Sequence, residues 1–115
     1  MKKKLKKIYC FDLDGTLCTQ CNGVYNKAKP IRNAIQKVNK LYDNGNRIII
    51  YTARYMGRTN GNIKAVYKMG YKKTLKQLKK WNVSFHNLIM GKPSCDLFVD
   101  DKAFGYSKKW INKKF

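Results

Sequence analysis

Four short stretches of the chain are apolar and bounded by polar or turn-forming residues. Residues 7–13 form a continuous apolar run that contains an aspartate, and residues 47–52 are β-branched through their centre. Residues 84–90 and 96–100 form two more runs, of which the first is the weaker. Runs of this length are typical of buried strands. We therefore predict strands over 7–13, 47–52, 84–90 and 96–100.

The stretches between these runs have helical spacing. From Ile31 onward, apolar residues fall at positions 31, 34, 35, 38, 41 and 42, which predicts an amphipathic helix ending near Asn44. A second helical segment begins near Ile63 and is predicted to be interrupted around Gly70. A capping-box pattern, Thr74-Leu-Lys-Gln77, then predicts the start of another helix, with an apolar face of Leu75, Leu78 and Trp81.

Alternation of strands and helices predicts an α/β fold with a Rossmann-like parallel sheet flanked by helices. A length of 115 residues suits a single domain, residues 1–115, and no repeat or linker divides it. Ligands of such sheets bind beyond the carboxyl ends of the strands. Asp12, Thr52, Lys92 and Asp100 each lie at such an end, so we expect them to meet at one edge of the sheet.

The few acidic residues are concentrated at two of these strand ends. The chain has 26 Lys and Arg but only six acidic residues, all of them Asp. Five of the six lie in segments 12–14 and 96–101. A carboxylate beside buried apolar surface is costly unless it is paired or bound to a cation. Two converging pairs of acids form a hard-oxygen site suited to Mg²⁺.

The net charge of +20 leaves two interpretations open. It attracts polyanions such as nucleic acid, or it reflects a general bias toward lysine. The lysines are dispersed along the sequence, and aromatic residues suited to stacking on bases are not interleaved with them. Nucleic acid therefore stays a partner that the sequence allows but does not favour.

The basic start of the chain resembles the first part of a signal peptide, but Asp12 and Asp14 interrupt the apolar stretch that follows. No segment approaches the roughly 20 apolar residues of a membrane span. We expect a cytoplasmic protein without a membrane partner and with reduced cysteines. Cys18 and Cys21 would supply two zinc ligands, and Cys95 and His86 would complete a set only if the fold brought them near. Packed thiols are the simpler expectation.

Four motifs in order resemble those of the haloacid dehalogenase-like phosphatases. They are Asp12-Leu-Asp14-Gly15-Thr16, then Thr52 after a β-branched strand, then Lys92, then Asp100-Asp101. The match spans residues 8–102. Two longer strings, over residues 48–60 and 90–102, most resemble small members of that family assigned to capsular polysaccharide biosynthesis.

The resemblance implies a role for each motif residue. Asp12 would be the nucleophile that forms an aspartyl-phosphate, and Asp14 would protonate the leaving oxygen and then deprotonate water. Mg²⁺ would be held by Asp12, the Asp14 main-chain carbonyl and Asp100, with Asp101 as an outer ligand or a partner of Lys92. Thr52 would donate to a phosphoryl oxygen, and Lys92 would place a positive charge over the transferring group. The neighbouring positions expected to contact substrate are Gly15, Thr16, Ala53, Arg54 and Arg58.

Larger members of that family carry a cap domain either after the first motif or between Thr52 and Lys92. Here the first gap holds only residues 17–29, and the second is filled by the helices and strand that the core needs, so we expect no cap domain. The expected function is a Mg²⁺-dependent phosphomonoester hydrolase acting on a sugar phosphate or another small phosphorylated metabolite. A homo-oligomer supplying a lid is compatible with the open site. Two alternatives stay open: a polynucleotide 3′-phosphatase, and a non-catalytic binding protein with the same fold.

Overall fold

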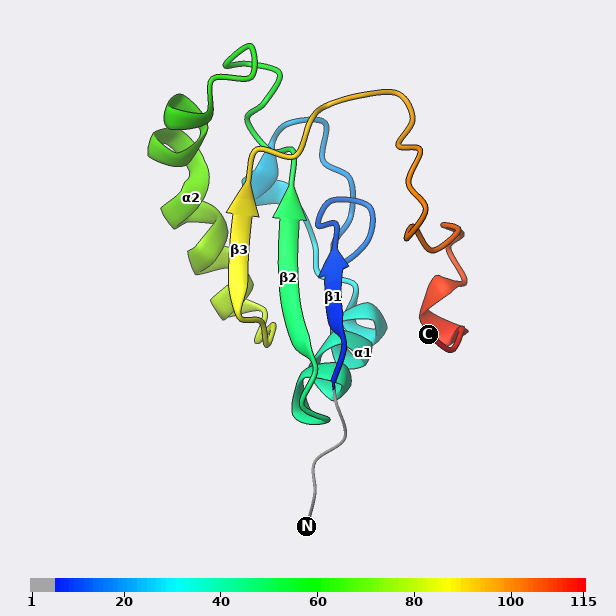
Figure 1. Ribbon diagram of the computed structural model, residues 1–115. Coiled ribbons are helices and arrows are strands. Elements are labelled where there is room, and N and C mark those ends of the chain that lie inside the picture. The colour runs from blue at the N-terminus through cyan, green and yellow to red at the C-terminus, as the bar shows by residue number, and fades with distance from the viewer. Residues whose placement is uncertain (1–5) are drawn as a thin grey trace.

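A three-stranded parallel sheet forms the centre of the computed structural model, which describes residues 6–115 (Figure 1). The strands are β1 (Ile8–Phe11), β2 (Arg47–Thr52) and β3 (Asn87–Met90), and β2 lies between the other two. Both strand pairs are parallel and in register, so the three carboxyl ends point toward the same edge of the sheet. The predicted α/β fold with a parallel sheet is therefore confirmed for these three strands.

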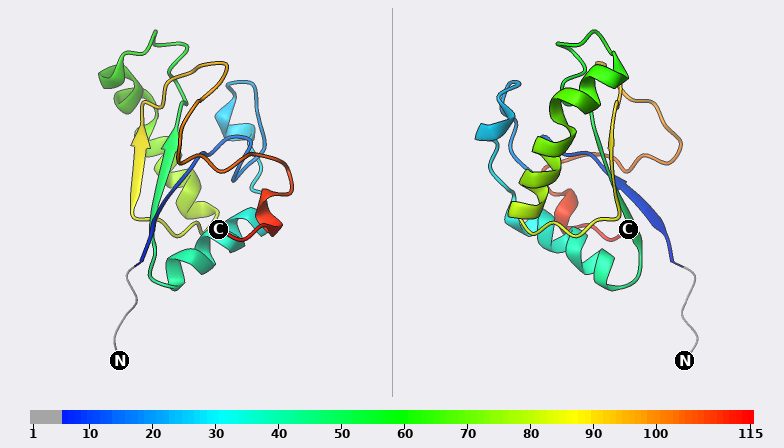
Figure 2. Two further views of the ribbon diagram at one scale, coloured as in Figure 1. Left: turned by 45° about the vertical axis from the view of Figure 1, so that its right-hand side comes forward. Right: turned by 90° about the vertical axis from the view of Figure 1, so that its left-hand side faces the viewer.

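Two helices cover one face of this sheet. Helix α1 (Arg32–Asp43) connects β1 to β2, and helix α2 (Ile63–Lys80) connects β2 to β3. Each connection crosses over between neighbouring parallel strands in the same direction, and right-handed crossovers of this kind place both helices on the same side. Figure 2 shows the two helices on that side and the loop after β3 on the other, before the chain returns beside α1. The expectation of helices flanking the sheet holds for one face.

Burial along β2 alternates in agreement with this arrangement. Ile48, Ile50 and Thr52 are buried beneath the helices, whereas Ile49 and Tyr51 on the opposite face are only half-buried. Successive side chains of a strand point to opposite faces of the sheet, which explains this alternation. The core that results holds the sheet against α1 and α2, through Leu13, Leu17, Ala34, Val38, Val66, Leu78 and Trp81 among others.

Helix α2 is continuous, so the predicted interruption around Gly70 is wrong. Gly70 is buried, and a Cβ there would collide with the ring of Tyr55. The glycine permits a close approach between the helix and the loop after β2. Thr74 is buried inside the helix and does not begin one. The residue that caps α2 is Asn62, whose side chain accepts a hydrogen bond from the Ala65 amide at 3.1 Å.

The predicted strand over 96–100 is wrong for this structure. Residues 91–109 follow β3 without a strand, and Leu97, Phe98 and Val99 are 78%, 49% and 91% exposed. Within the described residues β1 pairs only with β2, so its other edge has no strand beside it. The chain returns to the core at the short 3₁₀ helix η2 (Trp110–Asn112), where the Trp110 ring packs against Phe11 at 5.8 Å between centroids.

The first five residues, which carry part of the basic start of the chain, lie outside the described residues. Among residues 6–115, no helix combines the length and the apolar character needed to cross a membrane.

Candidate functional site

Asp12 and Asp14 lie directly after β1, on either side of the fully buried Leu13. The chain turns sharply here, since the amides of Thr16, Leu17 and Cys18 all donate to the Leu13 carbonyl. Gly15 adopts a φ of +85°, which a residue with a side chain rarely adopts. This turn holds both aspartates at the carboxyl edge of the sheet, as the sequence predicts.

Asp12 is half-exposed and has a partner for each oxygen. Lys92 Nζ lies 3.3 Å from its Oδ1, and the Thr16 hydroxyl donates to its Oδ2 at 3.2 Å. The Lys92 main-chain amide donates to the Thr52 carbonyl at 3.1 Å, which ties the segment after β3 to the end of β2. These contacts bring together Asp12, Thr52 and Lys92, as expected from three strand ends.

Asp14 forms a bidentate ion pair with Arg54. Arg54 Nε donates to Oδ2 and Nη2 donates to Oδ1, both at 2.8 Å. The Arg54 side chain is only 2% exposed, and that of Asp14 is 16% exposed. Burial by itself lowers the pKa of the Arg54 guanidinium, but the hydrogen bonds and charge of Asp14 outweigh it, so that the pKa is raised overall. The ion pair therefore holds the Arg54 guanidinium and the Asp14 carboxylate in place relative to each other.

Further contacts hold Arg54 from the other side. Its Nη1 donates to Gln77 Oε1 at 2.6 Å, and its guanidinium lies 4.7 Å from the centroid of the Tyr25 ring. The Gln77 amide in turn donates to the Tyr25 carbonyl at 2.8 Å. Tyr25 belongs to the short 3₁₀ helix η1 (Tyr25–Lys27), in the segment that follows the first motif. Sequence reasoning expected Arg54 to contact substrate; Arg54 does line the pocket, and each of its three side-chain nitrogens also donates to a protein group.

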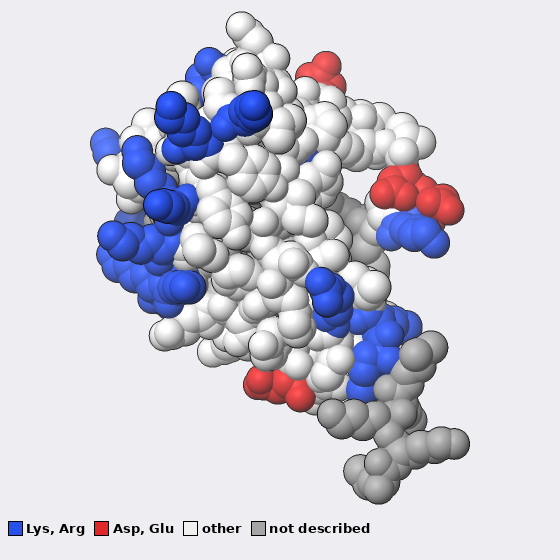
Figure 3. Space-filling view, turned by 60° about the vertical axis from the view of Figure 1, so that its left-hand side comes forward, with Lys and Arg blue, Asp and Glu red and all other residues white. Residues whose placement is uncertain are grey.

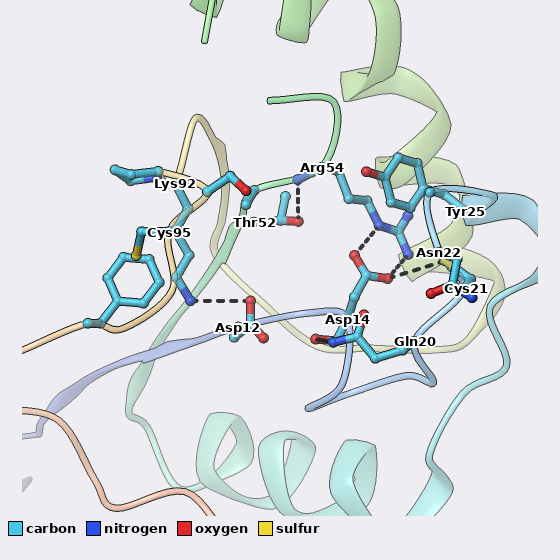
Figure 4. A pocket seen from close by; sticks show the side chains of 15 residues that line it. Asp12, Asp14, Gln20, Cys21, Asn22, Tyr25, Thr52, Arg54, Lys92 and Cys95 are labelled. Atoms are coloured by element: carbon cyan, nitrogen blue, oxygen red, sulfur yellow. Dashed lines mark hydrogen bonds and ion pairs between the residues drawn. The ribbon is translucent and has the colours of Figure 1, made fainter. Parts of the chain in front are cut away.

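A pocket of about 340 Å³ opens between these side chains (Figure 4). Asp12 and Lys92 form one side, and Asp14 and Arg54 form the other. Thr52 lies between them and is almost completely buried, and its hydroxyl accepts a hydrogen bond from the Arg54 amide at 3.2 Å. Ala53 also lines the pocket, together with Gln20, Cys21, Asn22, Gly23, Tyr25, Pro93, Ser94, Cys95 and Phe98.

Several predicted site residues lie at the margin of this pocket or outside it. Gly15 contributes its carbonyl to a hydrogen bond from the Tyr106 hydroxyl at 2.8 Å. Arg58 lies beyond the pocket, where its Nη2 donates to the Gly23 carbonyl at 2.6 Å. Asp100 and Asp101 are exposed and do not line the pocket, because the segment that carries them is not a strand beside β1.

The cysteines and His86 do not gather into a metal-binding set. Cys18 is buried, and its thiol donates to Asp14 Oδ1 at 3.3 Å. Burial raises the pKa of the Cys18 thiol, and the charge of Asp14 raises it further. His86 accepts a hydrogen bond from the Ile48 amide and stacks on Tyr42, but it remains exposed. Within residues 6–115, no three His, Cys, Asp or Glu side chains lie close enough together to hold a metal ion.

Sequence reasoning missed three residues of this site. Gln77 was assigned to a capping box, yet it bridges Arg54 and Tyr25. Gln20 donates to the main-chain carbonyl of Asp14 at 3.2 Å. Tyr25 had no local signal, since its contacts with the residues of the site are to positions more than 25 away.

Comparison with known proteins supports the fold. No protein-family model and no curated protein matches the chain. The crystal structure of a target protein from Vibrio cholerae is similar to it, with a TM-score of 0.80 and 26% sequence identity. The match covers 94% of this chain and 94% of that one. The arrangement of helices and strands is therefore one that a solved structure shares.

Proposed function

We propose that this protein is a phosphomonoester hydrolase whose nucleophile is Asp12. The observation that carries the proposal is the pairing of a half-exposed Asp12 carboxylate with the Lys92 ammonium group at 3.3 Å, on one side of an open pocket. Lysine beside an aspartate nucleophile suits phosphoryl transfer, because it offsets repulsion between the carboxylate and the anionic substrate. The order of Asp12, Thr52 and Lys92 at three neighbouring strand ends supports the same chemistry.

The reaction divides into two steps. In the first, a carboxylate oxygen of Asp12 forms a bond to phosphorus while the bond from phosphorus to the leaving oxygen breaks, which yields an aspartyl-phosphate. In the second, water attacks the phosphorus, and the Asp12 carboxylate leaves with the electrons of its bond to phosphorus. Lys92 stabilises the negative charge on the transferring group in both steps. Thr52 borders the space in which that group would lie.

Asp14 is the proposed acid and base, and its ion pair bears on each role. As a base toward water, Asp14 needs a free lone pair, and a carboxylate has about four acceptor positions for its two oxygens. As an acid toward the leaving oxygen, Asp14 must carry a proton, and the lone pair of Oδ2 that Arg54 does not occupy can hold it. The ion pair with Arg54 therefore leaves room for both roles, in which one proton is given up and taken back at the same oxygen.

Mg²⁺ is the proposed cofactor, and the pocket meets part of its requirements. Mg²⁺ is commonly held by one or two carboxylates, substrate phosphate oxygens and several waters. Asp12 provides a carboxylate, and the Asp14 main-chain carbonyl has a second lone pair beside the one that Gln20 occupies. When bound, the ion would supply charge neutralisation of the phosphate. Asp100, the further proposed ligand, lies outside the pocket, so its contribution stays a prediction.

A phosphate-release screen tests the proposal. Sugar phosphates, nucleoside monophosphates and an aryl phosphate are incubated with the protein with and without Mg²⁺. Release of phosphate by wild type, and its absence in Asp12→Asn, is the expected result. A wild-type protein that hydrolyses none of these substrates at any Mg²⁺ concentration would overturn the proposal for small substrates.

A further inference from the structure

A second, larger groove of about 790 Å³ lies beside the pocket, and five of its twelve lining residues are basic. Besides Arg54, these are Arg58 from the loop after β2 and Lys73, Lys76 and Lys80 from α2. None of the residues that line the groove is acidic. The sequence disperses its lysines, but the spacing of 73, 76 and 80 places these three on one side of the helix.

These cations are available to a ligand. Lys73, Lys76 and Lys80 are exposed, and the two ion pairs within the described residues involve other side chains. Four more exposed lysines lie on α2, at positions 64, 68, 72 and 79. Figure 3 shows basic side chains gathered along one side of the molecule, with the acidic side chains elsewhere on that face. Lysine side chains gathered in this way repel one another unless bound anions neutralise their charge.

The groove adjoins the pocket and shares part of its wall. Gly23, Tyr25 and Arg54 line both, and Gln77 lines the groove while it also bonds to Arg54. A ligand whose terminal phosphate lies beside Asp12 would therefore extend past Tyr25 onto α2. The number of cations exceeds what one additional phosphate group needs, which favours a chain of phosphates over a small bisphosphate.

Aromatic rings in this groove are already covered by guanidinium groups. The Arg58 guanidinium lies 4.9 Å from the Tyr55 ring centroid and 5.2 Å from that of Tyr25. Tyr55 is also buried. Rings in these positions do not offer free faces for stacking on bases. Contacts in the groove would therefore be made to phosphates, and they would carry little sequence preference.

We infer that the groove lined by Arg58, Lys73, Lys76 and Lys80 binds the phosphodiester backbone of a single-stranded nucleic acid whose terminal phosphate enters the Asp12 pocket. Only the part of this inference that places a terminal phosphate in the Asp12 pocket rests on the proposed phosphomonoesterase function. Binding of the internal phosphates depends on the groove alone. The substrate class that follows is an oligonucleotide bearing a terminal phosphomonoester.

Binding is measured with a fluorescent oligothymidylate that carries no terminal phosphate, so no chemistry takes part. Single-strand binding weakens with salt with a slope of about −0.7 in log K against log salt for each phosphate contact. Four cations in the groove predict a slope of about −3. The triple variant Lys73→Gln, Lys76→Gln, Lys80→Gln should reduce the magnitude of this slope by about 2 and weaken binding by about tenfold or more at 0.1 M salt.

The matched control removes three charges from other positions of the same helix. Lys64→Gln, Lys68→Gln, Lys79→Gln changes the net charge equally, but none of these three lysines lines the groove. The control variant is expected to retain the wild-type slope. Equal losses in the two triple variants would assign the binding to overall charge and overturn the inference.

A second measurement joins the groove to the pocket. Wild-type protein should release phosphate from a 3′- or 5′-phosphorylated oligonucleotide with a KM at least about tenfold below that for the corresponding mononucleotide, and only the groove variant should lose this difference. A nucleoside bisphosphate that competes as well as the oligonucleotide would overturn the nucleic-acid inference in favour of a small ligand. If wild type hydrolyses no phosphomonoester, the proposed function fails, while the salt slopes still decide the groove.

Discussion

Arg54 donates to both carboxylate oxygens of Asp14 at 2.8 Å and thereby joins the turn after β1 to the loop after β2. The two residues are 40 positions apart in the chain. Both are largely buried, so each would be costly without the other. This ion pair forms one side of the pocket, and the contact between Lys92 and Asp12 forms the other.

Asp12→Asn should lower phosphate release by about 10⁴-fold or more, because an amide is not a nucleophile toward phosphorus. The measurement is turnover of an aryl phosphate by freshly purified protein. Asp43→Asn is the matched control, since Asp43 is exposed at the end of α1 and does not line the pocket. Activity of Asp12→Asn within tenfold of wild type would remove Asp12 from the proposed role.

Arg54→Met should destabilise the fold by about 3–5 kcal/mol, because it leaves the Asp14 carboxylate buried without its partner. Urea unfolding of the variant and of wild type gives this difference. The double variant Asp14→Leu, Arg54→Met removes both charges and should recover most of the loss. A double variant that is less stable than Arg54→Met would show that packing, and not the unpaired carboxylate, causes the loss.

Stability should fall as the pH rises above about 9, because the raised pKa of Cys18 keeps its thiol protonated in the folded state. Above its usual pKa the unfolded chain releases this proton while the folded protein retains it. The free energy of unfolding then decreases by up to about 1.4 kcal/mol per pH unit for this group. Below the unfolded pKa the contribution is constant.

Unfolding measured in urea between pH 8 and 10 tests this effect. Cys18→Ala should show a shallower decline than wild type, whatever its absolute stability. Cys95→Ala, at an exposed cysteine, is the control and should decline as wild type does. Parallel curves for Cys18→Ala and wild type would contradict the expectation.

Thr74→Val should stabilise the protein by about 1 kcal/mol. The Thr74 hydroxyl is fully buried, and its oxygen makes no hydrogen bond with the rest of the described chain. Valine has nearly the same shape and removes the unsatisfied polar group. Thermal or chemical unfolding measures the change. Thr74→Ser, which retains the hydroxyl and loses the methyl group, should destabilise instead.

Asp100→Asn tests whether the sequence prediction for the metal ligands holds in the active protein. If segment 96–101 folds back toward Asp12 during turnover, the Mg²⁺ concentration for half-maximal activity should rise by about tenfold or more. Leu97 and Val99 are strongly exposed in the present arrangement, and burying them would favour such a movement. Asp96→Asn is the control. An unchanged Mg²⁺ requirement would leave Asp12 and the Asp14 carbonyl as the metal site.

Much of the fold follows from the sequence because local patterns determine it. The β-branched run at 47–52 and the helical spacing from Ile31 predict β2 and α1 to within one residue of the observed bounds. The error at Gly70 has a different origin. Glycine usually weakens a helix, but Tyr55 requires the space that a side chain would fill, and no local pattern reveals this contact.

The functional site likewise contains contacts that the sequence predicts and contacts that it does not. Strand-end positions predict the meeting of Asp12, Thr52 and Lys92, because parallel strands share an edge. The bidentate pairing of Arg54 is not predictable, since the sequence does not tell which of several cations near the edge lies next to Asp14. The segment 96–100 shows the limit of the apolar pattern, which predicts a strand where the structure has none.

The packing of the Tyr55 ring against Gly70 has a consequence for the order in which parts of the protein fold. Arg54 precedes Tyr55, and Gln77 lies two turns of α2 beyond Gly70, so the helix orients the cation that in turn holds Asp14. The contact between Lys92 and Asp12 closes a separation of 80 residues. Contacts so distant in sequence form late, because the chain entropy lost in closing them is offset only once the intervening elements have packed. The Lys92–Asp12 side of the pocket is therefore expected to form only once the sheet and α2 have packed.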